Sequence, residues 1–182
     1  MVYIALFRGI NVGRHALVSM ADLREVAAAA GCAEARTLLR SGNLVCRSAV
    51  RTGAELERRI AAAAKNRLPL VPDIFVRTAA EWKDVVAGNP FRQEAARDPS
   101  HLLVVFLRRA PGAADVKALR AAIIGGEAVR ARGRHAYLVY PAGIGRSRLT
   151  GTLIEQKLGR GTGRNWNTVL KLGVIAEELS RL

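Results

Sequence analysis

The sequence predicts an α+β fold in which two ferredoxin-like halves form one compact globule and the second half ends in helices. Over residues 1–78, short apolar runs alternate with amphipathic helical segments in a βαββαβ order. A similar order starts again near residue 100. A length of 182 residues, of which 50% are hydrophobic, suits a single compact unit. Within it we expect a first half with its linker over 1–98 and a second half over 99–182.

The first half begins with a continuously apolar run over 2–7, which is typical of a strand buried on both faces. Ser19 and Asp22 have capping-box spacing and predict a helix over about 20–30. Residues 41–43, Ser-Gly-Asn, favour a tight hairpin turn. The remaining elements of this half are expected as strands at about 36–40, 44–48 and 73–77, helices at about 54–66 and 79–87, and a polar link over 91–100.

The second half is expected to repeat βαββα and then to place a helix where a last strand would come. Its strands are predicted over 102–107 and near 127–132 and 135–140, with a helix over about 113–123 between the first two. Of Tyr137 and Tyr140, which point to opposite faces, one is expected to be exposed. The later elements are expected as a helix over about 148–158 capped by Ser147, a glycine-rich loop over 159–164, and a last helix over about 166–180 capped by Asn165.

The charge of the chain is strongly positive, with a net formal charge of +14. Of the 29 basic side chains 24 are Arg, which indicates either guanidinium groups placed to bind phosphate or carboxylate, or a genome rich in Ala, Gly and Arg codons. Residues 128–175 contain nine basic side chains and a single acid, Glu155. Codon bias should spread arginine evenly, so this segment is the better candidate for a surface that faces an anion.

Several classes of protein are disfavoured by the sequence. No apolar run is long enough to span a bilayer, no basic segment precedes the apolar start, and Cys32 and Cys46 form no CxxC pair, so a cytoplasmic protein is expected. His15, His101 and His135 form no metal-ligand spacing. We therefore expect neither a metal nor a cofactor, and no catalytic residue can be assigned.

A glycine-containing loop follows the first strand and is the first candidate site. It is neither a P-loop nor the dinucleotide fingerprint, because the required spacing is missing. Loops at the carboxyl ends of strands nevertheless often line ligand crevices. The alternative is that the glycines only permit a turn and that Asn11 caps the backbone. The candidate ligand-binding residues here are Arg8, Gly9, Asn11 and Gly13.

The segment from Gly159 to Asn165 is the second candidate site. A helix N-terminus has free amides and a partial positive charge, and successive glycines can form a nest around an anion. The alternative is a linker between helices with solvated arginines. We expect a ligand to lie between the first loop and the basic segment 144–171. The candidate residues in this second region are Arg146, Arg164, Asn165, Asn167, Thr168 and Lys171.

Several sequence blocks resemble those of bacterial domain-of-unknown-function family 1697. The blocks are 8–13 (Arg-Gly-Ile-Asn-Val-Gly), 20–24, 41–45, 89–91, 104–107, 140–150 and 164–169. The resemblance covers essentially the whole chain and implies a bacterial α+β protein, but it implies no activity. Arg14 departs from the usual pattern, in which a second glycine is common, and His15 and Ala16 replace a more polar pair.

Three functions remain open at this point. The first is a binding protein for a phosphate-rich ligand, either nucleic acid or a nucleotide. The second is an enzyme acting on a small anionic substrate, with the same loops as its anion cradle. The third is an interaction domain whose basic face meets an acidic protein. An open basic groove would favour the first, and an enclosed pocket with a titratable group the second. The oligomeric state is not indicated.

Overall fold

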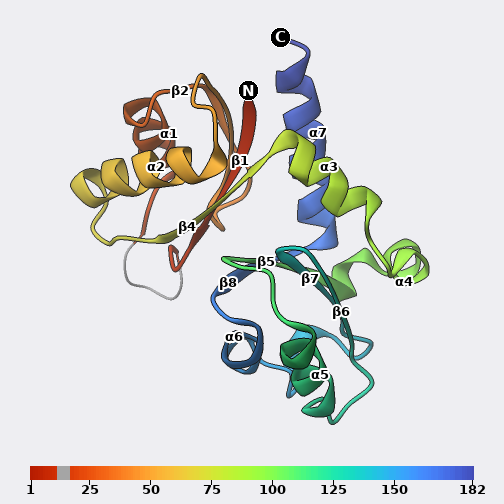
Figure 1. Cartoon of the computed structure of the whole chain (residues 1–182). Helices are drawn as coiled ribbons and strands as arrows, with labels where there is room; N and C mark the ends of the chain where they lie inside the picture. Colours follow the sequence, from red (N-terminus) through yellow and green to blue (C-terminus); the bar gives the residue numbers. More distant parts are fainter. Residues whose placement is uncertain (12–16) are drawn as a thin grey trace. The chain divides into compact units, whose positions relative to one another are not determined.

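The computed structural model describes residues 1–11 and 17–182 and is drawn in Figure 1. The chain forms two compact units, which are residues Met1–Asp84 with Lys171–Leu182, and residues Val85–Leu170. Each unit contains one four-stranded antiparallel sheet. The sequence-based division after residue 98 separates the same two sheets, whereas the grouping of the C-terminal residues with the first unit was not indicated by the sequence.

The first sheet has the strand order β2-β3-β1-β4, with the apolar strand β1 in its centre. Ser19 caps α1 as predicted, because its hydroxyl accepts from the Asp22 amide while the Asp22 carboxylate accepts from the Ser19 amide. The elements of this unit are β1 (Val2–Arg8), α1 (Met20–Ala29), β2 (Cys32–Thr37), β3 (Asn43–Ser48), α2 (Gly53–Arg67) and β4 (Asp73–Thr78), followed by α3 (Ala79–Ala87), whose last residues belong to the second unit.

The core of the first unit lies between its sheet and helices α1 and α2. Leu23 and Val26 of α1 and Leu56 and Ile60 of α2 are fully buried in one cluster with the same face of β1, which includes Phe7. These positions recur every three or four residues, so each helix buries one stripe. Fully burying a leucine-sized side chain contributes roughly 1.5–3 kcal/mol, so this stripe holds the two helices on the sheet.

The second sheet has the order β6-β7-β5-β8, in which the first strand of the repeat again lies between the third and the fourth. Both units therefore have the complete ferredoxin-like topology. The elements of this unit are α4 (Arg92–Arg97), a 3₁₀ turn (Pro99–His101), β5 (Leu102–Leu107), α5 (Ala113–Ala121), β6 (Ala128–Arg132), β7 (His135–Val139), a second 3₁₀ turn (Ile144–Arg146), α6 (Gly151–Leu158) and β8 (Gly161–Asn165), after which α7 (Trp166–Ser180) runs back into the first unit.

The fourth strand of the second sheet corrects the sequence prediction for 159–164. This segment was expected to be a glycine-rich loop, but Gly161–Asn165 forms β8 and pairs with β5 along its whole length. Glycine weakens a strand, which is why the sequence favoured a loop. The pairing to β5 and the burial of Thr162 and Arg164 outweigh that preference.

Other differences are local. Strand β2 lies earlier than predicted, so residues 38–42 form a longer connection in place of a tight turn, with Leu39 and Gly42 at positive φ. Helix α6 begins at Gly151, because Thr150 rather than Ser147 caps it. The expected link over 91–100 contains α4 and a 3₁₀ turn. Finally, Tyr137 and Tyr140 are both buried.

Candidate anion-binding surface

The glycines of β8 serve close packing within the second sheet. A Cβ added to Gly161 would lie 2.9 Å from Leu107 Cδ2, from the Phe106 carbonyl oxygen and from Val105 Cγ1. Only glycine fits there, because a Cβ needs more space than this. The backbone of β8 faces β5 rather than an open nest, so the physical reason for expecting an anion cradle at these glycines is removed.

The start of α7 is capped by the chain itself. The side chain of Asn165 accepts a hydrogen bond of 2.9 Å from the Thr168 amide, which confirms the predicted cap. Thr168 is buried, whereas Asn167 and Lys171 are exposed. Lys171 belongs to the first unit and the other three to the second.

Arg164 is a buried cation of the second unit. Its Nη1 donates to the Thr162 hydroxyl and to the Gly163 carbonyl, both at 2.8 Å, and the residue is 8% exposed. Burial disfavours the charged form and lowers the pKa of its guanidinium to about 10. The geometry explains Arg164 as a group that holds β8 in shape, in contrast to the exposed Arg146 of the second 3₁₀ turn.

The first predicted loop lies in the other unit. Gly9 is exposed with φ of 83°, and Arg8 is half-buried at the end of β1. The Asn11 side chain donates to the carbonyls of Val18 and Arg40 at 3.0 and 2.7 Å and accepts from the Val18 amide at 2.7 Å. It therefore fastens the loop, although it also lines an open hollow of about 530 Å³. Gly13 lies outside the described residues.

The strand ends of the second sheet bring together arginines that are distant in the sequence. The Leu107 amide donates to the Arg134 carbonyl at 2.9 Å, and the Arg108 amide donates to the Arg160 carbonyl at 3.0 Å. These bonds join the end of β5, the turn between β6 and β7, and the start of β8 at one end of the sheet. We call this group the arginine end. It consists of Arg108, Arg109, Arg132, Arg134 and Arg160.

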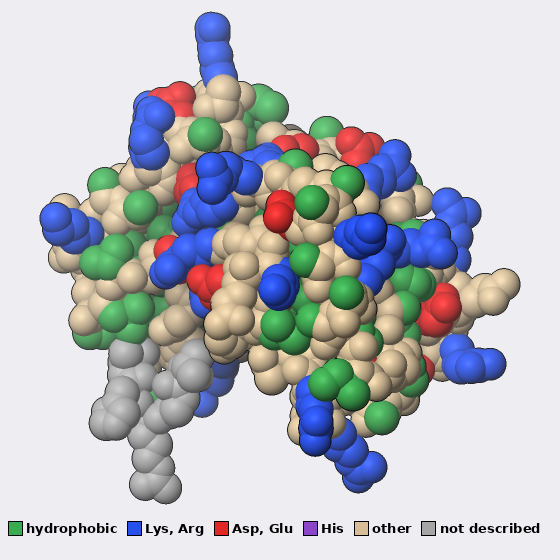
Figure 2. Space-filling model, turned by 60° about the horizontal axis from the view of Figure 1, so that its bottom comes forward, with side chains coloured by type: hydrophobic (Ala, Val, Ile, Leu, Met, Phe, Trp, Pro, Cys, Tyr) green, Lys and Arg blue, Asp and Glu red, His purple; other side chains and the backbone are tan. Residues whose placement is uncertain are grey.

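The arginine end faces outward. Arg134 is half-buried and the other four are exposed. Glu155 Oε1 lies 3.8 Å from Arg160 Nη1, and the Asp115 side chain caps α5 through the Gly112 amide. Positive charge thus exceeds negative charge there. On the face drawn in Figure 2, Lys and Arg side chains project at many points, with fewer Asp and Glu side chains between them.

A basic track leads from the arginine end along edge strand β6. Arg130 and Arg132 are two residues apart, so they project from the same side of the strand. The Arg130 guanidinium lies 5.7 Å from the centre of the Phe91 ring, in cation–π contact. Arg130 and Phe91 line an open hollow of about 660 Å³ with Arg120 and Glu127. Because Phe91 is only 6% exposed, its ring supports the Arg130 guanidinium and keeps it at this surface.

Sequence reasoning assigned none of these arginines as a candidate binding residue, although three of the five lie in the basic segment 128–175. They lie at or just outside strand ends, and only the strand order of the sheet brings them together. The excess of basic residues over 128–175 was the available signal, and it includes Arg130, Arg132, Arg134 and Arg160. Arg108 and Arg109 carried no signal, because the fold of β5 against β8 had to be known first.

Metal-binding clusters and membrane-spanning helices are both absent from residues 1–11 and 17–182. These residues contain no group of three or more His, Cys, Asp or Glu side chains that could hold a metal ion. The helices in this part of the chain are all too short or too polar to cross a membrane.

Comparisons with known proteins agree with the fold. The family model for proteins of unknown function DUF1697 matches residues 1–137. A solved structure, that of conserved bacterial protein SP0830 from Streptococcus pneumoniae, is similar with a TM-score of 0.70 and 18% sequence identity, covering 96% of this chain and 98% of that one. At this identity the similarity shows the fold alone. No curated protein matches the chain.

Proposed function

Because the chain belongs to the DUF1697 family of proteins of unknown function, its role has to be inferred from its own residues, and we propose that it binds a nucleic acid strand through the arginine end. The observation that carries the proposal is the convergence of Arg108, Arg134 and Arg160 at one end of the second sheet. Guanidinium groups bind phosphate oxygens through two parallel hydrogen bonds. Several of them on one outward surface suit a ligand with several phosphates.

The open shape of this surface supports a polymer over a small molecule. A pocket for a small anion encloses its ligand, whereas four of the five arginines here are exposed. The track along β6 extends the basic surface to Arg130, whose guanidinium lies over the ring of the buried Phe91. The predicted anion cradle in 159–165 contributes no support, since Gly161 and Gly163 belong to β8 and Gly159 ends α6.

We also propose that the protein works in the cytoplasm. Cys32 and Cys46 are free thiols, and the cytoplasm keeps thiols reduced.

The test measures binding of a fluorescein-labelled single-stranded oligonucleotide by anisotropy over a series of salt concentrations. The logarithm of the association constant should fall linearly with the logarithm of the salt concentration, because bound counterions are released. Removing Arg108 and Arg160 together by substitution with Gln should weaken binding and make the slope shallower by about one for each phosphate that is no longer neutralised.

The matched control replaces Arg51 and Arg58 with Gln, which removes the same charge from positions in the first unit. This variant should keep the wild-type slope. Equal weakening in both variants would show a general charge effect and would contradict a site at the arginine end. Absence of binding at low salt, or tight binding whose association constant does not depend on the salt concentration, would contradict nucleic acid as the ligand.

A further inference from the structure

A pair of free thiols lies at the edge of the first sheet, in the first unit, whereas the arginine end belongs to the second. Cys32 begins edge strand β2 and Cys46 lies in β3, and their Sγ atoms are 3.0 Å apart, with Cys46 donating to Cys32. Cys46 is fully buried, whereas Cys32 is partly exposed. Two thiols this close need only a small movement to form a bond, since a disulfide joins sulfurs about 2.05 Å apart.

The register of β2 against β3 places the two thiols on one face of the sheet. Cys32 pairs directly with Ser48 and Ala33 with Arg47, but the register shifts before Arg36 pairs with Val45. Cys46 therefore lies opposite the bulge, where Glu34 has a positive φ of 52°. Because Cys32 pairs with Ser48 and Cys46 precedes Ser48 by two residues, the two thiols are diagonal neighbours, and the one extra residue of the bulge increases the local twist. Cys46 belongs to the core cluster under α1 and α2 and Cys32 packs against it, which agrees with this placement.

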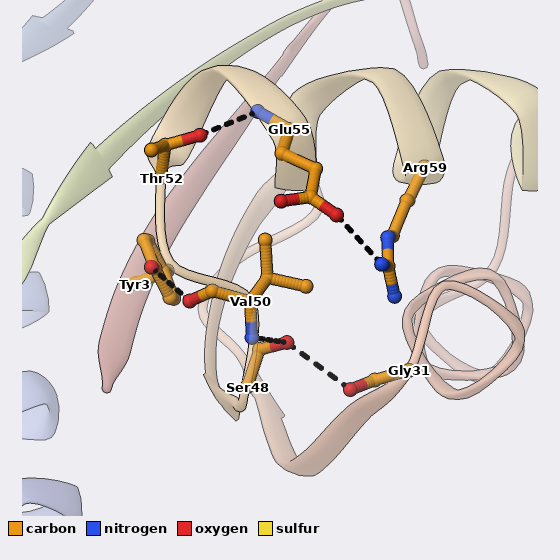
Figure 3. Close-up of polar contacts among 7 residues, drawn as sticks. All are labelled: Tyr3, Gly31, Ser48, Val50, Thr52, Glu55 and Arg59. Carbon is orange, nitrogen blue, oxygen red and sulfur yellow. Dashed lines mark hydrogen bonds and ion pairs between the residues drawn. The ribbon is translucent and has the colours of Figure 1, made fainter.

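A hydrogen-bond network holds the backbone beside Cys32. The Ser48 hydroxyl donates to the Gly31 carbonyl at 3.2 Å and accepts from the Val50 amide at 3.3 Å. The Val50 carbonyl in turn accepts from the buried Tyr3 hydroxyl at 2.6 Å. Figure 3 shows this series of bonds from Tyr3 to Gly31, next to the Thr52 cap of α2. The start of β2 is thus fixed against the end of β3.

We propose that Cys32 and Cys46 form a reversible dithiol site that exchanges with low-molecular-weight disulfides. The Cys32 thiolate attacks one sulfur of the disulfide RSSR, which forms a mixed disulfide on Cys32 and expels RS⁻. The Cys46 thiol then loses its proton and attacks Cys32 Sγ, expelling the second RS⁻. Both displaced thiolates take up the protons that the two cysteines lost. Two protein thiols are oxidised to one disulfide, and RSSR is reduced to two RSH.

The roles of the two cysteines follow from exposure and hydrogen bonding. Cys32 can meet a small disulfide at the sheet edge, whereas the buried Cys46 can reach only the Cys32 Sγ atom. The hydrogen bond from Cys46 lowers the pKa of Cys32, and donating that bond, together with burial, raises the pKa of Cys46. The product would close a covalent loop around the β2–β3 connection and its bulge, and amide hydrogen exchange in β2 should slow.

The test equilibrates the full chain with mixtures of reduced and oxidised glutathione, quenches with acid, and alkylates with N-ethylmaleimide in denaturant before measuring intact mass. In reducing mixtures the chain should carry two N-ethylmaleimide adducts. As the mixture becomes more oxidising, one transition should lead to a chain that carries no adduct and has lost two hydrogens, the mass of the internal disulfide. Retention of both thiols in the most oxidising mixture, or formation of disulfide-linked dimers, would overturn the proposal.

Two variants separate the roles. Cys46→Ser should stop with one glutathionyl group on Cys32, whereas Cys32→Ser should take up none while folded. The reverse pattern would overturn the assignment of Cys32 as the attacking group. If either variant fails to fold, the wild-type chain, alkylated early in the reaction, shows which cysteine forms the first mixed disulfide. Peptide mapping should then place the mixed disulfide on Cys32, and a mixed disulfide that never converts to the internal disulfide would count against Cys46.

Discussion

Arg108 and Arg160 are joined through their backbones, with the Arg108 amide donating to the Arg160 carbonyl at 3.0 Å. The bond continues the pairing of β5 with β8 by one step beyond Leu107 and Gly161. Both side chains are exposed, whereas Arg164 within β8 is buried. The β8 region thus connects an arginine available to a ligand with another that the fold requires.

Substitutions of Arg160 and Arg164 should therefore affect different properties of the protein. Arg160→Gln should weaken oligonucleotide binding and make the salt slope shallower by about one, with little change in the melting temperature. Arg164→Gln should lower the melting temperature, because Thr162 and Gly163 lose a buried charged donor, typically worth about 1.5–3 kcal/mol. Thermal unfolding and anisotropy measure the two effects. A stable Arg164→Gln protein with weakened binding would contradict the structural role of Arg164.

Gly161 and Gly151 provide a second matched pair. Gly161→Ala places a Cβ 2.9 Å from the Phe106 carbonyl and two side chains, so overpacking should cost about 1–3 kcal/mol. Gly151 begins α6 with open space around its Cα, and Gly151→Ala should stabilise the protein by about 0.5–1 kcal/mol. Denaturant unfolding checks both. Equal stability of the two variants would show that β8 does not need glycine at residue 161.

Much of the fold follows from patterns within the sequence. The apolar run of β5 and the capping box at Ser19 predicted their elements closely, because hydrophobic period and capping chemistry act over a few residues. The segment of β8 could not be found in this way. Its sequence, Gly-Thr-Gly-Arg-Asn, has poor strand propensity and becomes a strand only through contact with β5.

The candidate site was harder to predict than the fold. The sequence pointed to glycine loops, since glycine and arginine near a helix start often bind anions. In the structure Asn11 and Asn165 bond to the backbone, and Arg164 is buried. The proximity of Arg108 to Arg160 depends on strand order, which is a tertiary property. The proximity of Cys32 to Cys46 likewise depends on the register of β2 against β3, which no short motif indicated.

The three tyrosines offer a test of the core in alkaline solution. Burial is the main cause that raises the pKa of all three, to about 12 for Tyr137 and Tyr140, and Tyr137 also donates to the Val85 carbonyl at 2.8 Å. In the folded protein, absorbance at the phenolate band should change little at pH 10, whereas the unfolded chain should titrate near 10.

The same shifts set the direction of the pH effect on stability. Above pH 10 the unfolded state loses phenolic protons that the native state retains, so the free energy of unfolding should fall between about pH 10 and 12. Denaturant unfolding at several pH values measures this fall. A Tyr137→Phe variant should show a smaller one. A folded protein whose tyrosines all titrate near pH 10 would mean that these side chains reach solvent.

Cys32 should react with iodoacetamide in the folded protein while Cys46 does not. Cys32 is partly exposed and its pKa is lowered by the hydrogen bond from Cys46, so its alkylation should already be appreciable below the usual thiol pKa of about 8.5. The Cys46→Ser variant replaces the donating thiol by a hydroxyl and tests how far that bond sets the reactivity. Mass spectrometry of samples alkylated between pH 6 and about 9 gives the rate for each cysteine.

The Cys32→Ser variant is the control and should remain unmodified until denaturant is added. Equal reaction of both cysteines in the native protein would show that β2 opens from the sheet, and a rate that rises only near pH 9 would show that the bond does not favour the Cys32 thiolate.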